Sequence, residues 1–342
     1  MNVPCTPNPN PAVSILLPVH DADSTLRDCL RSVRRQEFGD WECVLVDDGS
    51  RDASAAIARE AARSDPRLRV LTTPHRGLVA ALNRGLDDCR GRLVARMDAD
   101  DLMHRRRLSD QVALLESHPA WVGSGCHVRI FPRDGLGAGN RAYEAWVNSI
   151  RSPEEVEREA FVECPVVHPT WIFRREVLSA YRYQDHGWPE DYDVILRMIT
   201  DGQKVGVLPR RRLAWRHTED RLSRRSPAYG QDRFTACKAH HLARSFLART
   251  ERYILWGYGG TGRALCRALG ENGKRPSHIV ELHEGRLGNR IQGAEVIPRD
   301  RLGSVPRLPL VVSVAGAGPR AEIRQALDRL GFVETRDFVC AA

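Results

Sequence analysis

The sequence predicts an α/β fold in which helices flank a mainly parallel sheet. In roughly the first 100 residues, short apolar runs that fit buried strands alternate four times with helical patterns. Two of these runs end in acidic residues. A separate pattern of strand, glycine-rich turn and helix begins near residue 251 and predicts a second, smaller α/β domain.

Four strand and helix pairs make up the first part. The expected strands are Val13–Val19, Glu42–Asp48, Leu68–Thr72 and Leu93–Met97. The expected helices begin at Asp23, run from Asp52 to about Arg63, from Leu78 to Cys89 and from Arg107 to Ser117. Apolar residues of the first helix recur at Leu26, Leu30 and Val33, which places them on one face.

The pattern is looser between residues 121 and 250. We expect a strand Trp121–Phe131, a glycine-rich loop Pro132–Asn140, a helix from Pro153, a helix within Gly187–Met198, short strands Lys204–Leu208 and Arg212–Trp215, and a polar connecting helix Pro227–Thr250.

The second domain has its own strands and helices. They are the strand Arg252–Trp256, a helix to about Gly270, the strands Ile279–Leu282 and Leu308–Val314, and the helix Arg320–Leu330. The predicted organisation is a leader (1–11), a first domain (12–225), a helical connector (226–250) and a small Rossmann-like domain (251–342).

Composition excludes several classes of protein. With 42% hydrophobic and 28% charged residues, the composition is that of a folded chain and not of a disordered one. No apolar run reaches about 18 residues, so we expect no membrane-spanning helix. Nine cysteines without a CxxC pair, and no signal-peptide pattern, favour a cytoplasmic location. The net charge of +8 is compatible with binding to nucleic acid, anionic lipid or phosphate-bearing ligands. Alternatively, it reflects only the arginine-rich codon usage of a GC-rich genome. No recognition helix or basic aromatic sheet is evident, so we expect no nucleic-acid partner.

Acidic residues stand where two predicted strands end. Asp47 and Asp48 close the second strand, and Asp98, Asp100 and Asp101 follow the fourth. The carboxyl ends of parallel strands share one edge of a sheet, where a nucleotide can lie and carboxylates can hold a divalent cation. The alternative is an acidic loop before the next helix, but like charges gathered at one edge cost stability.

The order of these motifs resembles family 2 glycosyltransferases. The matching stretches are Val13–Asp21, Val46–Asp52, Gly77–Gly85, Met97–Asp101 and Glu190–Asp191, over roughly residues 12 to 220. The resemblance implies a GT-A fold. It also implies an inverting, metal-dependent transfer of a sugar from a nucleotide-diphosphate donor to an acceptor hydroxyl, in bacterial polysaccharide or glycolipid biosynthesis.

The resemblance also assigns roles on the donor side. It implies that Pro18, Val19 and His20 line the nucleotide base and that Asp47 and Asp48 contact base or ribose. It also implies that Asp98, Ala99 and Asp100 form a DXD element, in which Asp98 lies towards the ribose and metal and Asp100 binds Mg²⁺ or Mn²⁺. The sequence departs from the family at Asp21, where asparagine is usual, and at Leu82, where arginine is common.

Acceptor-side roles follow from the same resemblance. Asp191 matches the general base, with Glu190 supporting it; alternatively these acids form an acidic first helical turn. His168 and Trp188 would border the acceptor, a saccharide or lipid-linked saccharide. His217 would help to hold the metal, although a lone histidine is more often only a satisfied polar residue. Arg221, Arg224 and Arg225 would clamp the diphosphate or form a solvated loop.

A third motif lies in the second domain. Gly257, Gly259 and Gly262 form a G-x-G-x-x-G turn between a strand and a helix, and Glu281 follows about 20 residues later, where an acid would meet a ribose. NAD or another nucleotide would fit there, or the domain has lost its ligand and serves docking or dimerisation. The alternative function is a nucleotide-sensing protein with a degenerate transferase domain. The intact acids Asp48, Asp98, Asp100 and Asp191 argue against degeneration. Peripheral contact with the inner face of a membrane is also expected.

Overall fold

The computed structural model describes residues 8–218, 221 and 226–342, which form two compact units. The first comprises residues up to 156 with 166–185 and 201–221, and the second comprises 157–165, 186–200 and 222–342. The predicted domain boundaries at residues 225 and 250 remain predictions. Segments 157–165 and 186–200 belong to the same compact unit as the C-terminal part of the chain.

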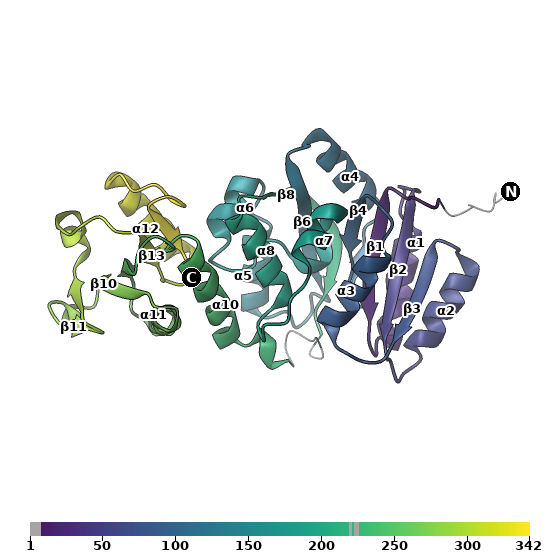
Figure 1. Cartoon of the computed structure of the whole chain (residues 1–342), viewed down its shortest axis with the longest axis horizontal. Coiled ribbons are helices and arrows are strands. Elements are labelled where there is room, and N and C mark those ends of the chain that lie inside the picture. The colour runs from purple at the N-terminus through teal and green to yellow at the C-terminus, as the bar shows by residue number, and fades with distance from the viewer. Residues whose placement is uncertain (1–7, 219–220, 222–225) are drawn as a thin grey trace. The chain divides into compact units, whose positions relative to one another are not determined.

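The first unit is built on a mixed, mostly parallel eight-stranded sheet (Figure 1). Its order is β3-β2-β1-β4-β7-β6-β8-β5. The strands are β1 Val13–Val19, β2 Trp41–Asp48, β3 Leu68–Thr73, β4 Leu93–Arg96, β5 Leu102–Met103, β6 Trp121–Phe131, β7 Ile172–Arg174 and β8 Lys204–Arg216. The helices are α1 Asp23–Arg34, α2 Ser54–Ser64, α3 Leu78–Asp88, α4 Arg107–Ser117, α5 Ala138–Val147, α6 Pro153–Glu159, which runs into the second unit, and α7 Arg175–Tyr181, with the 3-10 turn η1 His168–Thr170.

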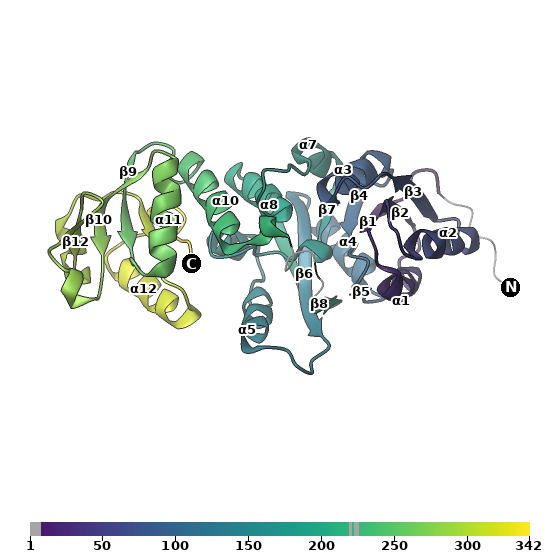
Figure 2. The same cartoon turned by 90° about the horizontal axis from the view of Figure 1, so that it is seen from below.

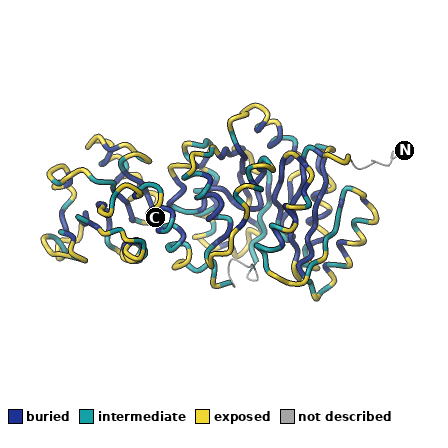
Figure 3. Tube along the Cα trace, in the orientation of Figure 1, coloured by how far each residue is buried: buried dark blue, intermediate teal, exposed yellow. Residues whose placement is uncertain are grey.

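The centre of this sheet follows from the continuous apolar runs in the sequence. Every residue of β1 and β2 is buried, and Figure 3 shows these strands in dark blue. Strand β1 pairs in parallel with both β2 and β4, so the carboxyl ends of all three strands lie at one edge. Helix α1 buries Leu26, Leu30 and Val33 against this sheet, as the spacing predicted.

Two predictions for the first unit need correction. The segment expected as two short strands is one strand, β8, which pairs with β6 through an irregular register on either side of His127. Pro209 lies at this irregularity, where its missing N–H removes no regular ladder bond. The loop expected through Asn140 turns into helix α5 at Ala138. The buried Glu144 on α5 accepts a hydrogen bond from Ile130 N at 3.0 Å, which holds the helix to β6.

The second unit contains a mixed six-stranded sheet, ordered β11-β12-β10-β9-β13-β14. The strands are β9 Arg252–Trp256, β10 Arg275–Val280, β11 Arg290–Ile291, β12 Ala294–Ile297, β13 Leu310–Val312 and β14 Phe338–Cys340. Only the β11–β12 pair is antiparallel among the described strands of this sheet. The helices are α8 Glu190–Thr200, α10 Gln231–Arg244, α11 Gly260–Glu271 and α12 Ala317–Arg329, with the 3-10 turns η2 Pro227–Tyr229, η3 Glu284–Arg286 and η4 Arg299–Ser304.

Helices α8 and α10 belong to the core of this second unit. Tyr192 and Leu196 of α8 share one apolar cluster with Leu242 of α10 and with Tyr253 and Leu255 of β9. Figure 2 shows α10 between α8 and α11. The segment expected as a polar connector is therefore amphipathic, with one face buried. Among the described residues, no helix is both long and apolar enough to cross a membrane.

Candidate active site

The carboxyl edge of the first sheet gathers the side chains that follow β1, β2 and β4. Pro18 and Val19 are buried at the end of β1, and His20 emerges beyond them. Asp47, at the end of β2, is buried and accepts a hydrogen bond from Ser50 N at 3.2 Å, which shapes the turn after the strand.

Asp48 organises the loop that leads into α3. Its side chain is 4% exposed, and its two oxygens accept hydrogen bonds from Arg76 N at 2.9 Å and Gly77 N at 2.8 Å. Gly49 has a φ of +67°, and a Cβ there would come within 2.7 Å of His75 N, so the turn requires glycine. Asp48 thus fixes the loop before α3 through main-chain hydrogen bonds. Its predicted contact with base or ribose remains a prediction.

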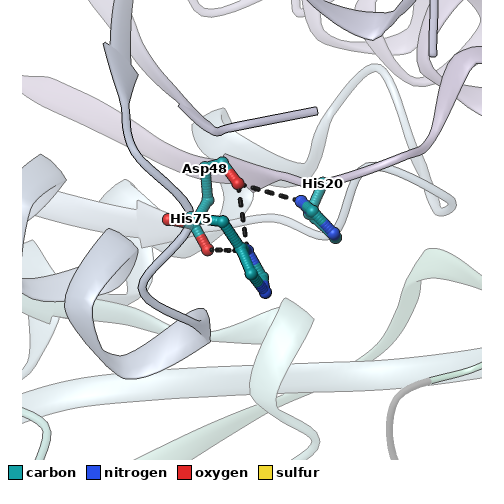
Figure 4. Close-up of side chains that lie close together, drawn as sticks. All are labelled: His20, Asp48 and His75. Atoms are coloured by element: carbon teal, nitrogen blue, oxygen red, sulfur yellow. Dashed lines mark hydrogen bonds and ion pairs between the residues drawn. The ribbon is translucent and has the colours of Figure 1, made fainter. Parts of the chain in front are cut away.

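His20 and His75 stack beside Asp48, as Figure 4 shows, with ring centroids 4.1 Å apart. The Nδ1 atoms lie 2.9 Å (His20) and 3.1 Å (His75) from the carbonyl oxygen of Asp48. Because a carbonyl oxygen only accepts, each Nδ1 donates the hydrogen bond to it. Sequence reasoning missed His75; its position just before Arg76-Gly77, at the start of a helix on the same edge, was the available signal.

The acids after β4 form a compact cluster. One ligand atom from each of Asp98, Asp100 and Asp101 lies within 4.8 Å of the other two. Asp101 is fully buried; its Oδ1 accepts from Arg216 N at 2.7 Å, while its Oδ2 has no hydrogen-bond partner among the described residues. Burial, then Asp100 and Asp98, hold the pKa of Asp101 well above its ordinary value. Burial and Asp98 likewise raise the pKa of Asp100.

Arginines surround this cluster. Arg96, buried in β4, forms an ion pair with Asp98. Arg221 lies 3.8 Å from Asp98 and 4.0 Å from Asp100, and its guanidinium stacks over Trp215 at 4.5 Å. Arg221 thus lies beside the acids, and its predicted contact with the diphosphate remains a prediction. Arg224 and Arg225 lie outside the described residues. Arg96 was missed, although an arginine inside an apolar strand signals a buried partner.

The three carboxylates fit a hard divalent cation. They offer only oxygen ligands, and one buried oxygen has no donor among the described residues. Their mutual repulsion would be relieved by positive charge. His217 is not a member of this group: its Nε2 lies 3.3 Å from Asn140 Nδ2. Its role as a metal ligand remains a prediction. Ala99, which stands between Asp98 and Asp100 in the sequence, is buried.

The predicted acceptor-side acids lie on α8 in the second unit. Asp191 is half-buried in the first turn, and its Oδ1 accepts from Tyr192 N at 2.7 Å. Glu190 is buried and accepts a hydrogen bond from the hydroxyl of Tyr229 at 2.6 Å. Of the two, Asp191 is the more exposed, as a base that meets a substrate must be.

A neighbouring acid on α8 has a different environment. Asp193 is buried and accepts hydrogen bonds from Arg197 at 2.8 Å, His241 at 3.0 Å and Trp188 Nε1 at 3.1 Å. Burial alone would raise its pKa, but the bonds from His241 and Arg197 outweigh burial and lower the pKa to about 2. Trp188, predicted to border the acceptor, therefore also anchors the first turn of α8.

His168 lies in the first unit and is buried. Its Nε2 is 3.0 Å from the hydroxyl of Tyr183, and its ring packs against Trp171. Burial and the charge of Arg96 hold its pKa well below the ordinary value, which keeps the ring neutral. The predicted acceptor contact of His168 remains a prediction.

The glycine motif of the second unit forms the turn between β9 and α11. Gly257 has a φ of +93°, Gly259 immediately precedes α11, and a Cβ on Gly262 would lie 2.1 Å from Gly257 O. Glu281 follows β10, accepts from Leu282 N at 2.8 Å and pairs with Arg286 at 2.5 Å.

Comparison with known proteins identifies relatives of this chain. Residues 14–182 match the family described as glycosyl transferase family 2. The chain is 34% identical over 200 residues to the amylovoran biosynthesis glycosyltransferase AmsE of Erwinia amylovora, covering 57% of this chain and 73% of that protein. It is 30% identical over 241 residues to the putative glycosyltransferase EpsE of Bacillus subtilis, covering 68% and 84%.

Two solved structures share the fold. TarS of S. aureus in complex with UDP-GlcNAc has a TM-score of 0.55 and 17% identity, covering 75% of this chain and 71% of that one. The mannosyltransferase PcManGT of Pyrobaculum calidifontis, in complex with GDP-Man and Mn²⁺, has a TM-score of 0.50 and 20% identity, covering 78% and 71%. None of these comparisons supports the Rossmann-like assignment of residues 251–342, which remains a prediction.

Proposed function

Because the chain belongs to glycosyl transferase family 2, we propose that it transfers a sugar from a nucleotide-diphosphate donor to an acceptor hydroxyl with inversion and with the help of a divalent metal. The observation that carries this proposal is the cluster of Asp98, Asp100 and Asp101 at the carboxyl edge of a mostly parallel sheet. An edge of this kind is where open α/β sheets bind nucleotides.

On the donor side, we assign the diphosphate to the acid cluster and the base to the neighbourhood of His20. Mg²⁺ or Mn²⁺, held by Asp100 with Asp98 and Asp101, would supply positive charge to the departing diphosphate. The bound nucleotide sugars of TarS and PcManGT support a donor of this class. Arg221, fixed over Trp215, would add a second positive charge on the same side.

On the acceptor side, we assign the general base to Asp191. Its carboxylate would take the proton of the acceptor hydroxyl as the acceptor oxygen bonds to the anomeric carbon and the bond to the diphosphate breaks. Attack opposite the leaving group inverts the anomeric centre. Glu190, held by Tyr229, would fix the first turn of α8 so that Asp191 keeps its orientation.

The biological setting that fits best is bacterial surface polysaccharide or glycolipid assembly. The similarity to an amylovoran biosynthesis enzyme supports a saccharide or lipid-linked saccharide as the acceptor. The excess of basic residues in the sequence would favour peripheral contact with an anionic leaflet.

Thermal unfolding of the full-length chain tests this function. UDP, GDP, TDP and CDP are each added with Mn²⁺ or with EDTA, and the midpoint temperature is measured. We expect one nucleoside diphosphate to raise the midpoint more with Mn²⁺ than with EDTA, and Asp100→Ala to lose this Mn²⁺-dependent difference. Asp28→Ala, which removes only an exposed pair with Arg31, is the matched control and keeps the shift. If no nucleoside diphosphate gives a larger shift with Mn²⁺ than with EDTA, or if that difference survives Asp100→Ala, the proposed metal site is refuted.

A further inference from the structure

The turn between β9 and α11 brings main-chain N–H groups to the carboxyl edge of the second sheet. Gly257 and Gly262 let the chain cross itself closely, since a Cβ on Gly262 would meet Gly257 O at 2.1 Å. Helix α11 then begins with Gly259 as its N-cap, which offers no side-chain hydrogen bond. The first N–H groups of this 12-residue helix are therefore not capped by that side chain.

The neighbouring strand provides a second turn at the same edge. Strand β13 pairs in parallel with β9, and Ser313 N donates to Trp256 O at 2.8 Å, so the two turns run side by side. Helix α12 also starts after a glycine, Gly316, which has a φ of +99° and provides no side-chain cap. Two helix N-termini, each with a partial positive charge, thus follow adjacent strands.

The second turn begins with Ser313, directly after β13. Ser313 is 3% exposed, and its Oγ has no hydrogen-bond partner among the described residues. Its Cβ lies 3.8 Å from the position that a Cβ on Gly262 would occupy, so the hydroxyl is next to the glycine turn. A buried hydroxyl without a partner costs free energy, and a ligand that accepts its hydrogen bond would recover it.

Charged side chains complete the surroundings of the turn. Arg286 donates to Tyr258 O at 3.0 Å, which fixes its guanidinium beside the turn. Glu281, after β10, forms an ion pair with this arginine at 2.5 Å, which balances the charge of the arginine. An incoming anion would therefore meet the two helix N-termini and a neutralised acid.

We propose that this turn binds a diphosphate group through the N–H groups at the start of α11 and the hydroxyl of Ser313. The site is additional to the proposed donor site of the first unit, and it needs no metal because its donors are N–H and O–H groups. The diphosphate comes either from a nucleotide, with Glu281 accepting from a ribose hydroxyl, or from inorganic pyrophosphate.

Calorimetric titration of the full-length Asp100→Ala variant in EDTA tests the proposal, because these conditions silence the metal-dependent site. Pyrophosphate, UDP and NAD⁺ are titrated separately. We expect at least one to bind; tighter binding of a nucleotide than of pyrophosphate identifies the nucleotide as the source, and the reverse identifies pyrophosphate. Absence of binding for all three at millimolar concentration overturns the proposal.

Two further substitutions in this variant locate the binding. Gly259→Asp has open space for its side chain and places a carboxylate at the N-cap of α11, where it stabilises the helix and repels an anion. We expect affinity to fall about tenfold or more. Ser313→Ala should weaken binding severalfold without loss of the fold. Gly270→Asp, which adds the same charge near the other end of α11, is the matched control and should bind as before. Unchanged affinity in Gly259→Asp would also overturn the proposal.

Discussion

The carboxyl edges of the two sheets have opposite chemistry in the same topological position. At the edge of the first sheet, Asp98, Asp100 and Asp101 crowd together, and burial with mutual repulsion raises the pKa of the last two. At the edge of the second sheet, glycine turns and helix N-termini present N–H groups, and the hydroxyl of Ser313 has no partner in the part of the chain that the structure describes. The first edge is suited to a cation and the second to an anion.

The difference shows that a parallel sheet provides a location and that the residues after each strand determine what binds there. The acidic side chains after β4 repel one another, so the first edge costs folding free energy unless a positive charge is bound there. Glycines after β9 bring bare backbone to the second edge, which favours negative charge. Substitutions that change one charge at either edge can test this comparison.

The largest effect is expected for Asp100→Asn. The acid cluster loses the carboxylate that we assign to the metal, so sugar transfer should fall by roughly a thousandfold, the order typical of a lost catalytic electrostatic contact. In EDTA, the same variant should unfold at a higher temperature than the wild type, because one of three repelling carboxylates is gone. Release of nucleoside diphosphate measures the first effect and calorimetry the second. Lower stability in EDTA would show that the cluster is not repulsive.

Asp191→Asn should reduce transfer by roughly a hundredfold or more while leaving the affinity for the nucleotide donor unchanged, because a general base acts only on the acceptor. Single-turnover rates and donor titration separate the two quantities. Asp232→Asn, which also changes an acid in a first helical turn, is the matched control on α10 and should keep full activity. A donor affinity that falls with the rate would contradict the assignment.

The sequence predicts the frame of both edges better than their detail. Continuous apolar runs marked β1, β2 and β4, and the acids after them fell at one edge because parallel neighbours end together. The stack of His20 on His75 could not be predicted, because it depends on how the loop before α3 folds back onto Asp48. The lack of a partner for Asp101 Oδ2 within the described part of the chain is likewise a property of packing.

Secondary structure was mispredicted where tertiary contacts override local signals. Two short strands were expected over Lys204–Leu208 and Arg212–Trp215, yet β8 is continuous because the register with β6 shifts between them. The glycine-rich stretch before Asn140 suggested a loop, but α5 starts within it and is held by Glu144. The polar composition of α10 hid the buried face that includes Cys237 and Leu242.

Asp193 provides a third test, because it is a buried acid with the opposite pKa shift to Asp100. Its pKa of about 2, against an ordinary value of 3.8, corresponds to roughly 2 kcal/mol of stability. Since the folded-state pKa is lowered, this stability is present above about pH 4 and is lost as the pH falls towards 2. Asp193→Asn should therefore unfold at lower urea concentration at pH 7, and the difference from the wild type should shrink as the pH falls from 4. A difference that is constant over this range would show that ionisation of Asp193 contributes nothing.

The smallest effect sharpens the comparison most directly. Gly259→Asp in the otherwise unchanged protein adds a carboxylate at the second edge, where it caps the N–H groups of α11 and interacts favourably with the helix dipole. Replacing glycine by aspartate at an N-cap is worth a few tenths of a kcal/mol, so the midpoint of thermal unfolding without ligand should rise by roughly 1 °C. Gly270→Asp, near the C-terminus of the same helix, should lower the midpoint by a similar amount, because the dipole there is negative. One edge would then be stabilised by removing a carboxylate and the other by adding one, as their opposite preferences for charge require. A fall in the midpoint of Gly259→Asp would mean that the start of α11 does not attract negative charge.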